Sequence, residues 1–196
     1  GFDFKSFDKE MKTTTNNASL WPEKFLFVGR LAEEKGIAIL VEAYKKYRSL
    51  MDNPWPLTFC GEGKEKDKCR GVPGVHLAGF VQPHALPRIM WDHGVFLLPS
   101  RFEPWGAVIA EACGSGLPVV CTESCGAGLD LIRNYYNGIT VPANDADAFC
   151  RAMVWMHEHS ASLPEMGRRS VEMARPFAAE NWAARWTEYC LEAAGM

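Results

Sequence analysis

The sequence lacks several features that would assign it to a common class of protein. No apolar run approaches the ~20 residues that span a bilayer, and the opening GFDFKSFDKE has no signal-peptide hydrophobic region. The formal net charge is -3, so there is no basic excess of the kind that binds nucleic acid. Internal repeats and low-complexity tracts are also missing. We therefore expect a soluble protein without a nucleic-acid partner, in which any anion site is built from a few placed cations.

The seven cysteines do not form a pattern typical of disulfides or metal sites. They are odd in number, scattered and mostly embedded in apolar segments, so we interpret them as reduced core thiols of a cytosolic protein. Only Cys121 and Cys125 are close, in CTESC. No second cysteine pair or HxxxH completes a zinc set, and we exclude a metal site there.

What is present is an alternation of short β-rich runs with longer amphipathic segments. The 196 residues, 47% of them hydrophobic, suit one globular domain with a full core. Apolar strands that are each followed by a helix are typical of a parallel sheet covered on both faces. We predict a doubly wound, Rossmann-like α/β sheet of about six strands, with a helical C-terminal tail. The predicted strands are 25–28, 57–60, 75–77, 95–98, 118–121 and 139–141, and the predicted helices are 37–49, 64–69, 85–91, 106–113, 128–133, 145–159, 164–175 and 179–193.

In such a sheet, ligands bind at the carboxyl ends of the strands. After the first strand, GRLAEEKG places Gly29, Arg30 and Lys35 around a turn into a helix, a combination that favours phosphate. A solvated loop, in which Glu33 and Glu34 pair with both cations, explains the same residues.

The loops after the second and third strands are weaker signals. CGEGKEKDK lacks the third glycine of a dinucleotide fingerprint and the Gly-Lys-Ser/Thr of a P-loop, and a plain turn is the safer interpretation. In AGFVQPHAL, Gly79 ends a strand and Phe80-Val81 could lie beside a flat ring. Helix capping through Gln82-Pro83 is the alternative.

The fourth loop lies in PSRFEPWGAVIAEACGSGLPVV. We predict that Glu103 is a helix N-cap and that Pro104 is the first helical residue. Glu111 would then follow about 12 Å further along the axis, which fits a hydrolytic carboxylate pair poorly. Two separate contacts fit better, because a nucleoside diphosphate sugar carries one diol on its ribose and another on its sugar. The N–H groups near residues 105–107 would face the diphosphate.

These stretches resemble a known family. FVGRLAEEKG, the CGEG turn, LAGFV and PSRFEPWGAVIAEACGSGLPVV are similar, from about Lys24 to Ala143, to the donor-binding domain of retaining group 1 glycosyltransferases of GT-B fold. The start, Gly1-Phe2-Asp3 followed by Phe7, resembles the G-V-D-x-x-x-F segment that follows the N-terminal domain in these enzymes. The resemblance implies that the chain is the C-terminal half of such an enzyme.

The resemblance also implies roles for individual residues. Arg30 and Lys35 would hold the donor diphosphate. Glu103 would bind hydroxyls of the transferred sugar, and Glu111 would bind the ribose. Glu103, Arg30 and Lys35 are the catalytic candidates. The further donor-binding positions are Gly29, Gly79, Phe80, Val81, Trp105, Gly106 and Ala107.

The family transfers a hexosyl group from a nucleoside diphosphate sugar to a glycan or lipid-linked acceptor, with retention and generally without a metal or other cofactor. The resemblance therefore implies a cytoplasmic enzyme of polysaccharide assembly, compatible with peripheral association at the inner face of the membrane. We expect an interdomain linker at 1–23, a Rossmann-like core at 24–143 and C-terminal helices at 144–196. The acceptor domain that would precede them is not in the sequence, so we expect the isolated chain to be inactive. Trp105 stands where many members have phenylalanine or a smaller residue, which leaves the donor base and sugar open.

Four other features or functions deserve comparison with this interpretation. Asp145-Ala-Asp147 is a D-x-D, but it opens a predicted helix and is interpreted as a cap rather than a metal site. His157 and His159 are two apart on a predicted helix, so their rings diverge and are expected to be exposed. A dehydrogenase domain is disfavoured, because the sequence lacks the motif G-x-G-x-x-G after the first strand. A non-catalytic module that binds a nucleotide or nucleotide sugar stays open as an alternative to the enzyme.

Overall fold

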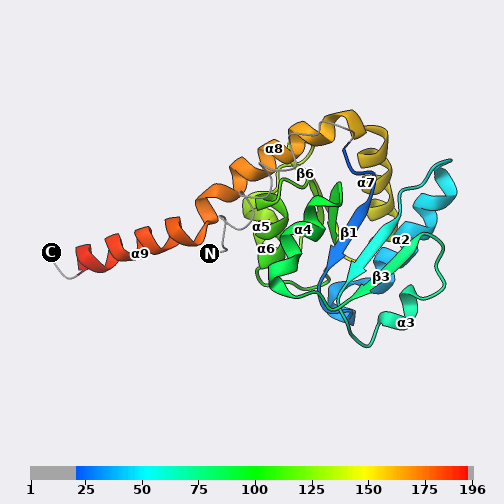
Figure 1. Cartoon of the computed structure of the whole chain (residues 1–196), viewed down its shortest axis with the longest axis horizontal. Helices are drawn as coiled ribbons and strands as arrows, with labels where there is room; N and C mark the ends of the chain where they lie inside the picture. Colours follow the sequence, from blue (N-terminus) through cyan, green and yellow to red (C-terminus); the bar gives the residue numbers. More distant parts are fainter. Residues whose placement is uncertain (1–20, 194–196) are drawn as a thin grey trace.

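A computed structural model describes residues 21–193, apart from the side chain of Trp182 (Figure 1). The Gly1–Phe7 motif and residues 1–20 of the predicted linker lie outside the described residues. The described part has the predicted architecture, a parallel sheet with helices packed against it.

The sheet has six strands in the order β3-β2-β1-β4-β5-β6, and every neighbouring pair is parallel. This order confirms the doubly wound α/β fold. β1 and β4 are apolar along their whole length and largely buried, as strands covered on both faces must be. The strands are β1 Phe25–Val28, β2 Leu57–Cys60, β3 Val75–Gly79, β4 Val95–Leu98, β5 Val119–Thr122 and β6 Gly138–Val141.

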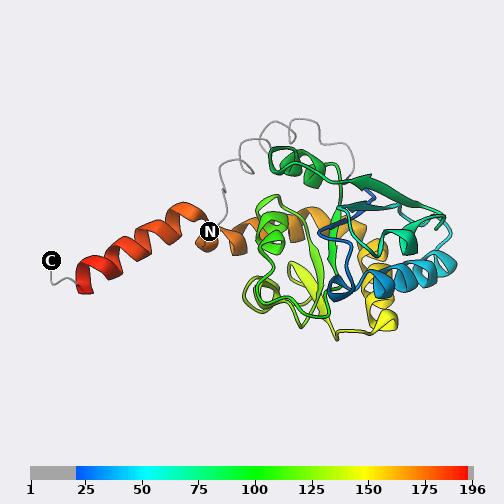
Figure 2. The same cartoon turned by 90° about the horizontal axis from the view of Figure 1, so that it is seen from below.

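The helices cover the sheet in two layers (Figure 2). Right-handed crossovers that run outward from β1 and from β4 in opposite directions put their helices on opposite faces. α2 packs against α7, and α5 packs against α6 and α8. The α-helices are α2 Ile37–Leu50, α3 Lys66–Cys69, α4 Leu86–Trp91, α5 Ala107–Gly114, α6 Gly126–Leu131, α7 Ala146–Glu158, α8 Leu163–Ala174 and α9 Ala179–Ala193, and the 3-10 turns are η1 Glu33–Lys35, η2 Pro83–Ala85, η3 Ser160–Ser162 and η4 Arg175–Phe177.

The C-terminal tail differs from the rest of the domain. α9 projects away from the sheet and its helices (Figure 1). Trp186 and Tyr189 on this helix are 54% and 66% exposed. These two aromatic side chains therefore do not enter the domain core.

Two motifs near α7 were interpreted from sequence alone. Asp145 is the N-cap of α7, and its carboxylate accepts from the Ala148 N–H at 2.8 Å, which confirms the capping role. Asp147 pairs with Lys46 at 2.7 Å. The expected exposure of His157 is wrong, because its ring is half-buried against α2.

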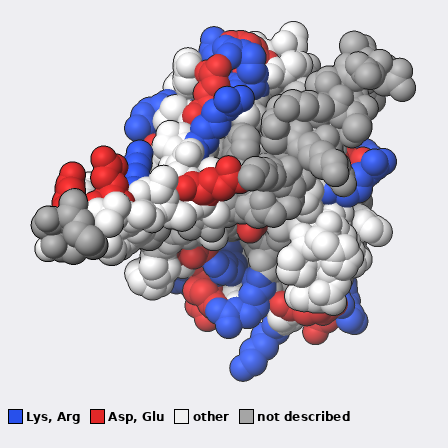
Figure 3. Space-filling model, turned by 60° about the vertical axis from the view of Figure 1, so that its left-hand side comes forward, with Lys and Arg blue, Asp and Glu red and all other residues white. Residues whose placement is uncertain are grey.

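Positive and negative side chains are interspersed over the described surface shown in Figure 3, without a large patch of one sign. Between residues 21 and 193, each helix is too short or too polar to cross a membrane.

Candidate functional site

Two loops meet where the order of the strands reverses. β1 and β4 are neighbours, so the loop at 29–36 and the loop at 99–106 leave the same edge of the sheet. Gly36 has a φ of 70°, and a Cβ there would lie 2.0 Å from the Pro99 carbonyl oxygen. Glycine at this position allows the two loops to touch.

Lys35 and Glu103 form an ion pair across these loops. Lys35 Nζ donates to Glu103 Oε2, and the two side chains are only 20% and 12% exposed. The backbone N–H of Arg101 donates to the Glu34 carbonyl at 2.8 Å, which holds the loops together. Solvent and salt screen a shielded pair weakly. Two of the three catalytic candidates thus lie in contact, and their charges compensate each other.

Glu103 is held from behind by the turn between β5 and α6. Its N–H donates to the Ser124 carbonyl at 3.2 Å, and its own carbonyl accepts from the Gly126 N–H at 3.1 Å. These bonds form an isolated parallel bridge between Glu103 and Cys125. The backbone that carries the carboxylate is therefore supported by two loops of the same sheet edge.

This bridge overturns one prediction about the start of α5. Glu103 is not the N-cap, and Pro104 is not helical. The N-cap is Gly106, with a φ of 89°, and the helix begins at Ala107. The physical reason is that the β5 turn engages the backbone of Glu103 in strand-like pairing. The helical estimate of its distance to Glu111 does not apply, since only Glu111 lies on the helix.

The chain just before α5 presents unused hydrogen-bond donors. The N–H groups of Trp105, Gly106 and Ala107 find no acceptor between residues 21 and 193. α5 has eight residues, and the N–H groups at its start carry the positive end of the helix dipole. This segment can therefore bind an anionic or hydroxyl oxygen.

Glu111 lies on the next turn of α5. Its side chain is half-buried, and no donor to its carboxylate is found in the described part of the chain. Burial raises the pKa of this carboxyl group above its ordinary value. An unpaired, partly desolvated carboxylate retains both oxygens for hydroxyl donors.

Arg30 occupies a different position from Lys35. Its guanidinium donates to Glu34 at 2.6 Å and its side chain is 69% exposed. Glu33 pairs instead with Arg101, at 2.6 Å. The alternative in which acidic neighbours pair with the cations of this loop is thus correct for Arg30 and wrong for Lys35.

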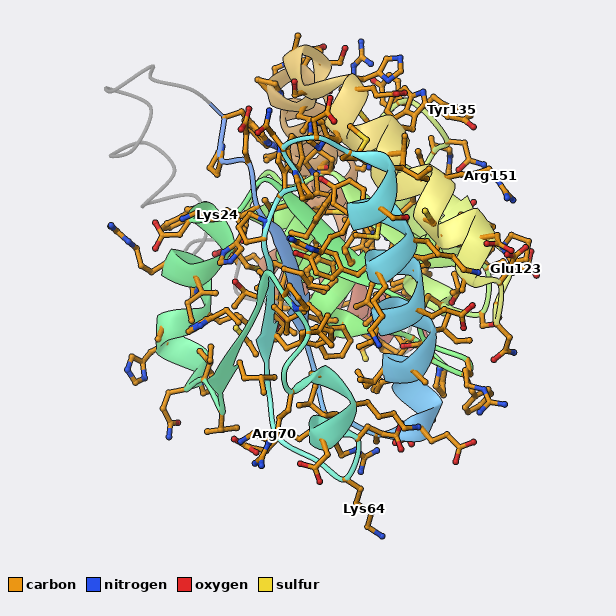
Figure 4. All side chains as sticks on the ribbon, turned by 90° about the vertical axis from the view of Figure 1, so that its right-hand side faces the viewer. Lys24, Lys64, Arg70, Glu123, Tyr135 and Arg151 are labelled. Atoms are coloured by element: carbon orange, nitrogen blue, oxygen red, sulfur yellow. The ribbon has the colours of Figure 1, made fainter. Side chains whose placement is uncertain are left out.

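The predicted turn at Gly79–Val81 lies on the same edge but further along the sheet. β2 separates β3 from β1, and the Gly61 N–H donates to the Gly79 carbonyl at 2.7 Å. Phe80 is 68% exposed, and Val81 is half-buried. Gly29 ends β1, and its N–H donates to Cys60 of β2 at 2.9 Å. The loop after β2 extends outward beyond these turns, and its Lys64 points away from the domain (Figure 4).

Trp105 has a neighbour that sequence reasoning did not identify. Its ring lies 5.9 Å from that of Phe177 in η4, and Trp105 stays 41% exposed. Ser124 and Cys125, which support Glu103, were also missed. Neither contact follows from local periodicity, because each joins segments that are distant in the chain.

Known proteins share both the sequence pattern and the fold. A profile described as "Glycosyl transferases group 1" matches residues 22–159. D-rhamnosyltransferase WbpZ of Pseudomonas aeruginosa is 30% identical over 172 residues, which cover 81% of this chain and 44% of that protein.

Two solved structures illustrate the likeness in fold. Sucrose-phosphate synthase of Thermosynechococcus elongatus superposes with a TM-score of 0.79 at 23% identity, covering 100% of this chain and 52% of that chain. Anabaena HepE in complex with UDP and glucose gives a TM-score of 0.75 at 19% identity, covering 97% and 56%. These are GT-B glycosyltransferase folds, and the likeness lies in one domain of each.

The chain spans only part of the proteins that it matches. It covers 19%, 44% and 33% of the length of the first three curated relatives. The match to the family profile nevertheless includes every strand of the sheet and both loops of the candidate site. The chain belongs to the glycosyl transferases group 1 family.

Proposed function

We propose that this chain is the donor-binding part of a retaining glycosyltransferase. The enzyme would transfer a hexosyl group from a nucleoside diphosphate sugar to a glycan or lipid-linked acceptor. One observation carries the proposal: an unpaired, half-buried carboxylate and a set of unused N–H groups flank a shielded Lys–Glu pair at the reversal point of a doubly wound sheet. Similarity to a structure solved with UDP and glucose supports the choice of ligand.

The groups suit the successive parts of such a donor. Glu111 would accept hydrogen bonds from the two ribose hydroxyls. The amides at 105–107 and the ammonium group of Lys35 would bind the diphosphate. Glu103 would bind hydroxyls of the transferred sugar, since its second oxygen is free of the Lys35 bond. Phe80 would border the base.

Arg30 requires a change of partner. Its guanidinium pairs with Glu34 in an exposed bond, which contributes little to stability. The phosphates of the donor offer a stronger, charge-assisted alternative. We propose that Arg30 turns to the leaving phosphate and, together with Lys35, stabilises its developing charge. Same-face attack, without a metal, would then give retention.

The chain covers less than half of the length of the first three curated relatives. An active site between two domains supplies orientation that one wall does not. We therefore propose that the 196 residues bind a nucleoside diphosphate weakly and transfer no sugar, and that an acceptor domain elsewhere in the full-length protein completes the site. A non-catalytic module that binds a nucleotide or nucleotide sugar is the alternative.

Calorimetric titration with UDP, GDP and ADP, and with their sugars, tests the site. We expect one nucleotide to bind, and Glu111→Ala to weaken its binding. Glu158→Ala is the matched control, because Glu158 is an exposed carboxylate at the end of α7. Binding by none of the ligands, or binding that is equal in the wild type and Glu111→Ala, would contradict the proposal. Transfer by the full-length protein, measured with a labelled donor, separates the enzyme from the binding module.

A further inference from the structure

Two cysteines lie side by side behind the loop that carries Glu103. Cys121 belongs to β5, and Cys125 precedes α6 as its N-cap. Both side chains are fully buried. A Cβ added at Gly128 would lie 2.8 Å from the Cys121 sulfur and 3.5 Å from Cβ of Cys125, so the two side chains enclose this glycine. Glu123 in the same turn points outward (Figure 4).

Cys125 differs from the other buried cysteines, Cys121 included, in the direction of its pKa shift. A hydrogen bond from the Cys121 thiol lowers the pKa of Cys125 below its ordinary value, against the effect of burial. The Thr122 hydroxyl oxygen lies 3.5 Å from the Cys125 sulfur. By contrast, burial raises the pKa of Cys60 to about 11 and that of Cys113 to about 12. Cys125 is therefore the more acidic thiol of the pair, and its thiolate is the reactive form.

The turn that holds Cys125 is bonded directly to the candidate site. Ser124 accepts from the N–H of Glu103, and Gly126 donates to the carbonyl of Glu103. Thr122, at the other end of the turn, donates its hydroxyl to the Ser100 carbonyl at 2.5 Å. A displacement of this turn must therefore move the loop after β4.

We propose that Cys121 and Cys125 form a reversible disulfide when a peroxide oxidises them, and that this bond displaces Glu103 and weakens donor binding. The disulfide itself is independent of the proposed function. Its effect on the donor rests on that function.

The chemistry balances with hydrogen peroxide as the oxidant. The Cys125 thiolate attacks one peroxide oxygen, the O–O bond breaks, and the departing hydroxide takes up a proton to become water. Cys125 is then a sulfenic acid. The Cys121 thiol attacks this sulfur and loses its proton, which leaves with the hydroxyl group as a second water. Two thiols are oxidised to one disulfide, and one peroxide is reduced to two waters.

The bond requires Cys125 to leave its present contacts. Its sulfur lies 3.5 Å from the Thr122 hydroxyl and 4.0 Å from the Leu98 carbonyl oxygen. A disulfide needs a separation of about 2.05 Å between the sulfurs. Because the interior is closely packed, the turn has to shift to provide it. Ser124 and Gly126 beside Cys125 are only half-buried, so a local opening of the turn admits a molecule as small as peroxide.

The first experiment asks whether the bond forms. The chain with Cys190→Ser, which removes an exposed thiol, is treated with hydrogen peroxide, blocked with iodoacetamide, digested and analysed by mass spectrometry. We expect a Cys121–Cys125 disulfide in the digest, which dithiothreitol reduces. The proposal would be overturned if both cysteines stay reduced at every peroxide dose, so that iodoacetamide alkylates them once the treated chain is denatured and no disulfide is found.

The second experiment asks whether the bond reaches the site. Amide hydrogen exchange of residues 102–106 is compared in the reduced, oxidised and re-reduced chain. We expect faster exchange at Glu103 after oxidation and recovery on reduction. Oxidised Cys125→Ser and Cys121→Ser chains should exchange like the reduced one. Unchanged exchange in a chain whose disulfide is demonstrated would contradict the coupling.

Titration with UDP, GDP and ADP completes the test. Oxidation should lower the affinity for the bound nucleotide by about tenfold or more, since small displacements of positioning groups are costly. The serine variants should keep their affinity in peroxide. If the reduced chain binds no nucleotide, the proposed function fails, while the peptide and exchange measurements still decide the disulfide. Equal affinity of reduced and oxidised chains would reject its effect on the donor.

Discussion

The two edges of the sheet treat polar groups in opposite ways. At the amino edge, where the strands begin, the Tyr47 hydroxyl lies beside the start of β2. It is 2.6 Å from His157 Nδ1 and accepts from the Trp55 N–H at 2.8 Å. At the carboxyl edge, the Glu111 carboxylate has no donor and the N–H groups of residues 105–107 have no acceptor within the described chain. The groups around Tyr47 are satisfied internally, whereas Glu111 and the amides at 105–107 stay unsatisfied within the described residues. We infer that the first edge contributes stability and the second contributes binding.

Removing one hydroxyl at the amino edge gives the largest expected effect. Tyr47→Phe leaves the Trp55 N–H and His157 without their partner, which costs about 1–3 kcal/mol for each unsatisfied buried group. We expect a lower free energy of unfolding and unchanged nucleotide affinity in the folded chain. Urea denaturation and calorimetry measure the two quantities. If the variant loses nucleotide affinity together with stability, the two edges do not have separate roles.

At the carboxyl edge, the same logic predicts the reverse pattern. Glu111→Ala removes hydrogen bonds to a charged acceptor, worth about 1.5–3 kcal/mol, so affinity should fall by about 10- to 100-fold. Calorimetric titration measures the loss.

Glu111→Gln sharpens this prediction. A raised carboxyl pKa means that the folded chain binds more protons than the unfolded chain, so ionisation destabilises the fold as pH rises. The neutral amide should therefore increase the free energy of unfolding at neutral pH while affinity still falls. A loss of stability on substitution would show that Glu111 has a structural partner.

Acid should weaken the amino edge. Burial lowers the pKa of His157, and also that of His93, whose ring bonds to Ile89 and Thr58. With both folded pKa values depressed, the unfolded chain binds more protons, and stability falls as pH drops through about 6.5. Urea denaturation across this range measures the slope. His93→Gln should reduce it, and an unchanged slope would assign the effect to other groups.

The smallest expected effect concerns Trp105. Its half-exposed ring, supported by Phe177, borders the loop of Glu103. Trp105→Ala should leave the affinity for the nucleoside diphosphate unchanged and lower the affinity for the nucleotide sugar a few-fold. The effect is small because an exposed ring contributes about 1 kcal/mol or less. The ratio of the two dissociation constants measures this. Equal losses for both ligands would place Trp105 at the diphosphate instead.

Local pattern predicted the elements well. Strands 25–28, 57–60 and 95–98 and helix 179–193 were predicted to the residue, and the other three strands deviate by one or two residues. Apolar runs of four residues between turn signals are unambiguous when every strand is buried on both faces. Lys35 and Glu103 were both named, yet their contact was not, since the partners come from different strands.

The errors have a common physical origin. Glu103 was predicted as a cap because Pro104 suits a first helical position, but the turn after β5 pairs with its backbone. His157 was predicted to be exposed because helical spacing separates it from His159, but α2 packs against its ring. In both cases a contact between distant segments outweighed a local preference of about 1 kcal/mol.

By itself, the sequence determined the doubly wound sheet, the family and the identity of the polar residues at its carboxyl edge, because periodicity and turn chemistry act over a few neighbouring residues. Only the tertiary structure decided which charges pair, where α5 begins and which carboxylate stays unpaired. It also placed Cys125 behind Glu103. Those outcomes depend on burial and on contacts across strands, and both exist only once the chain has folded.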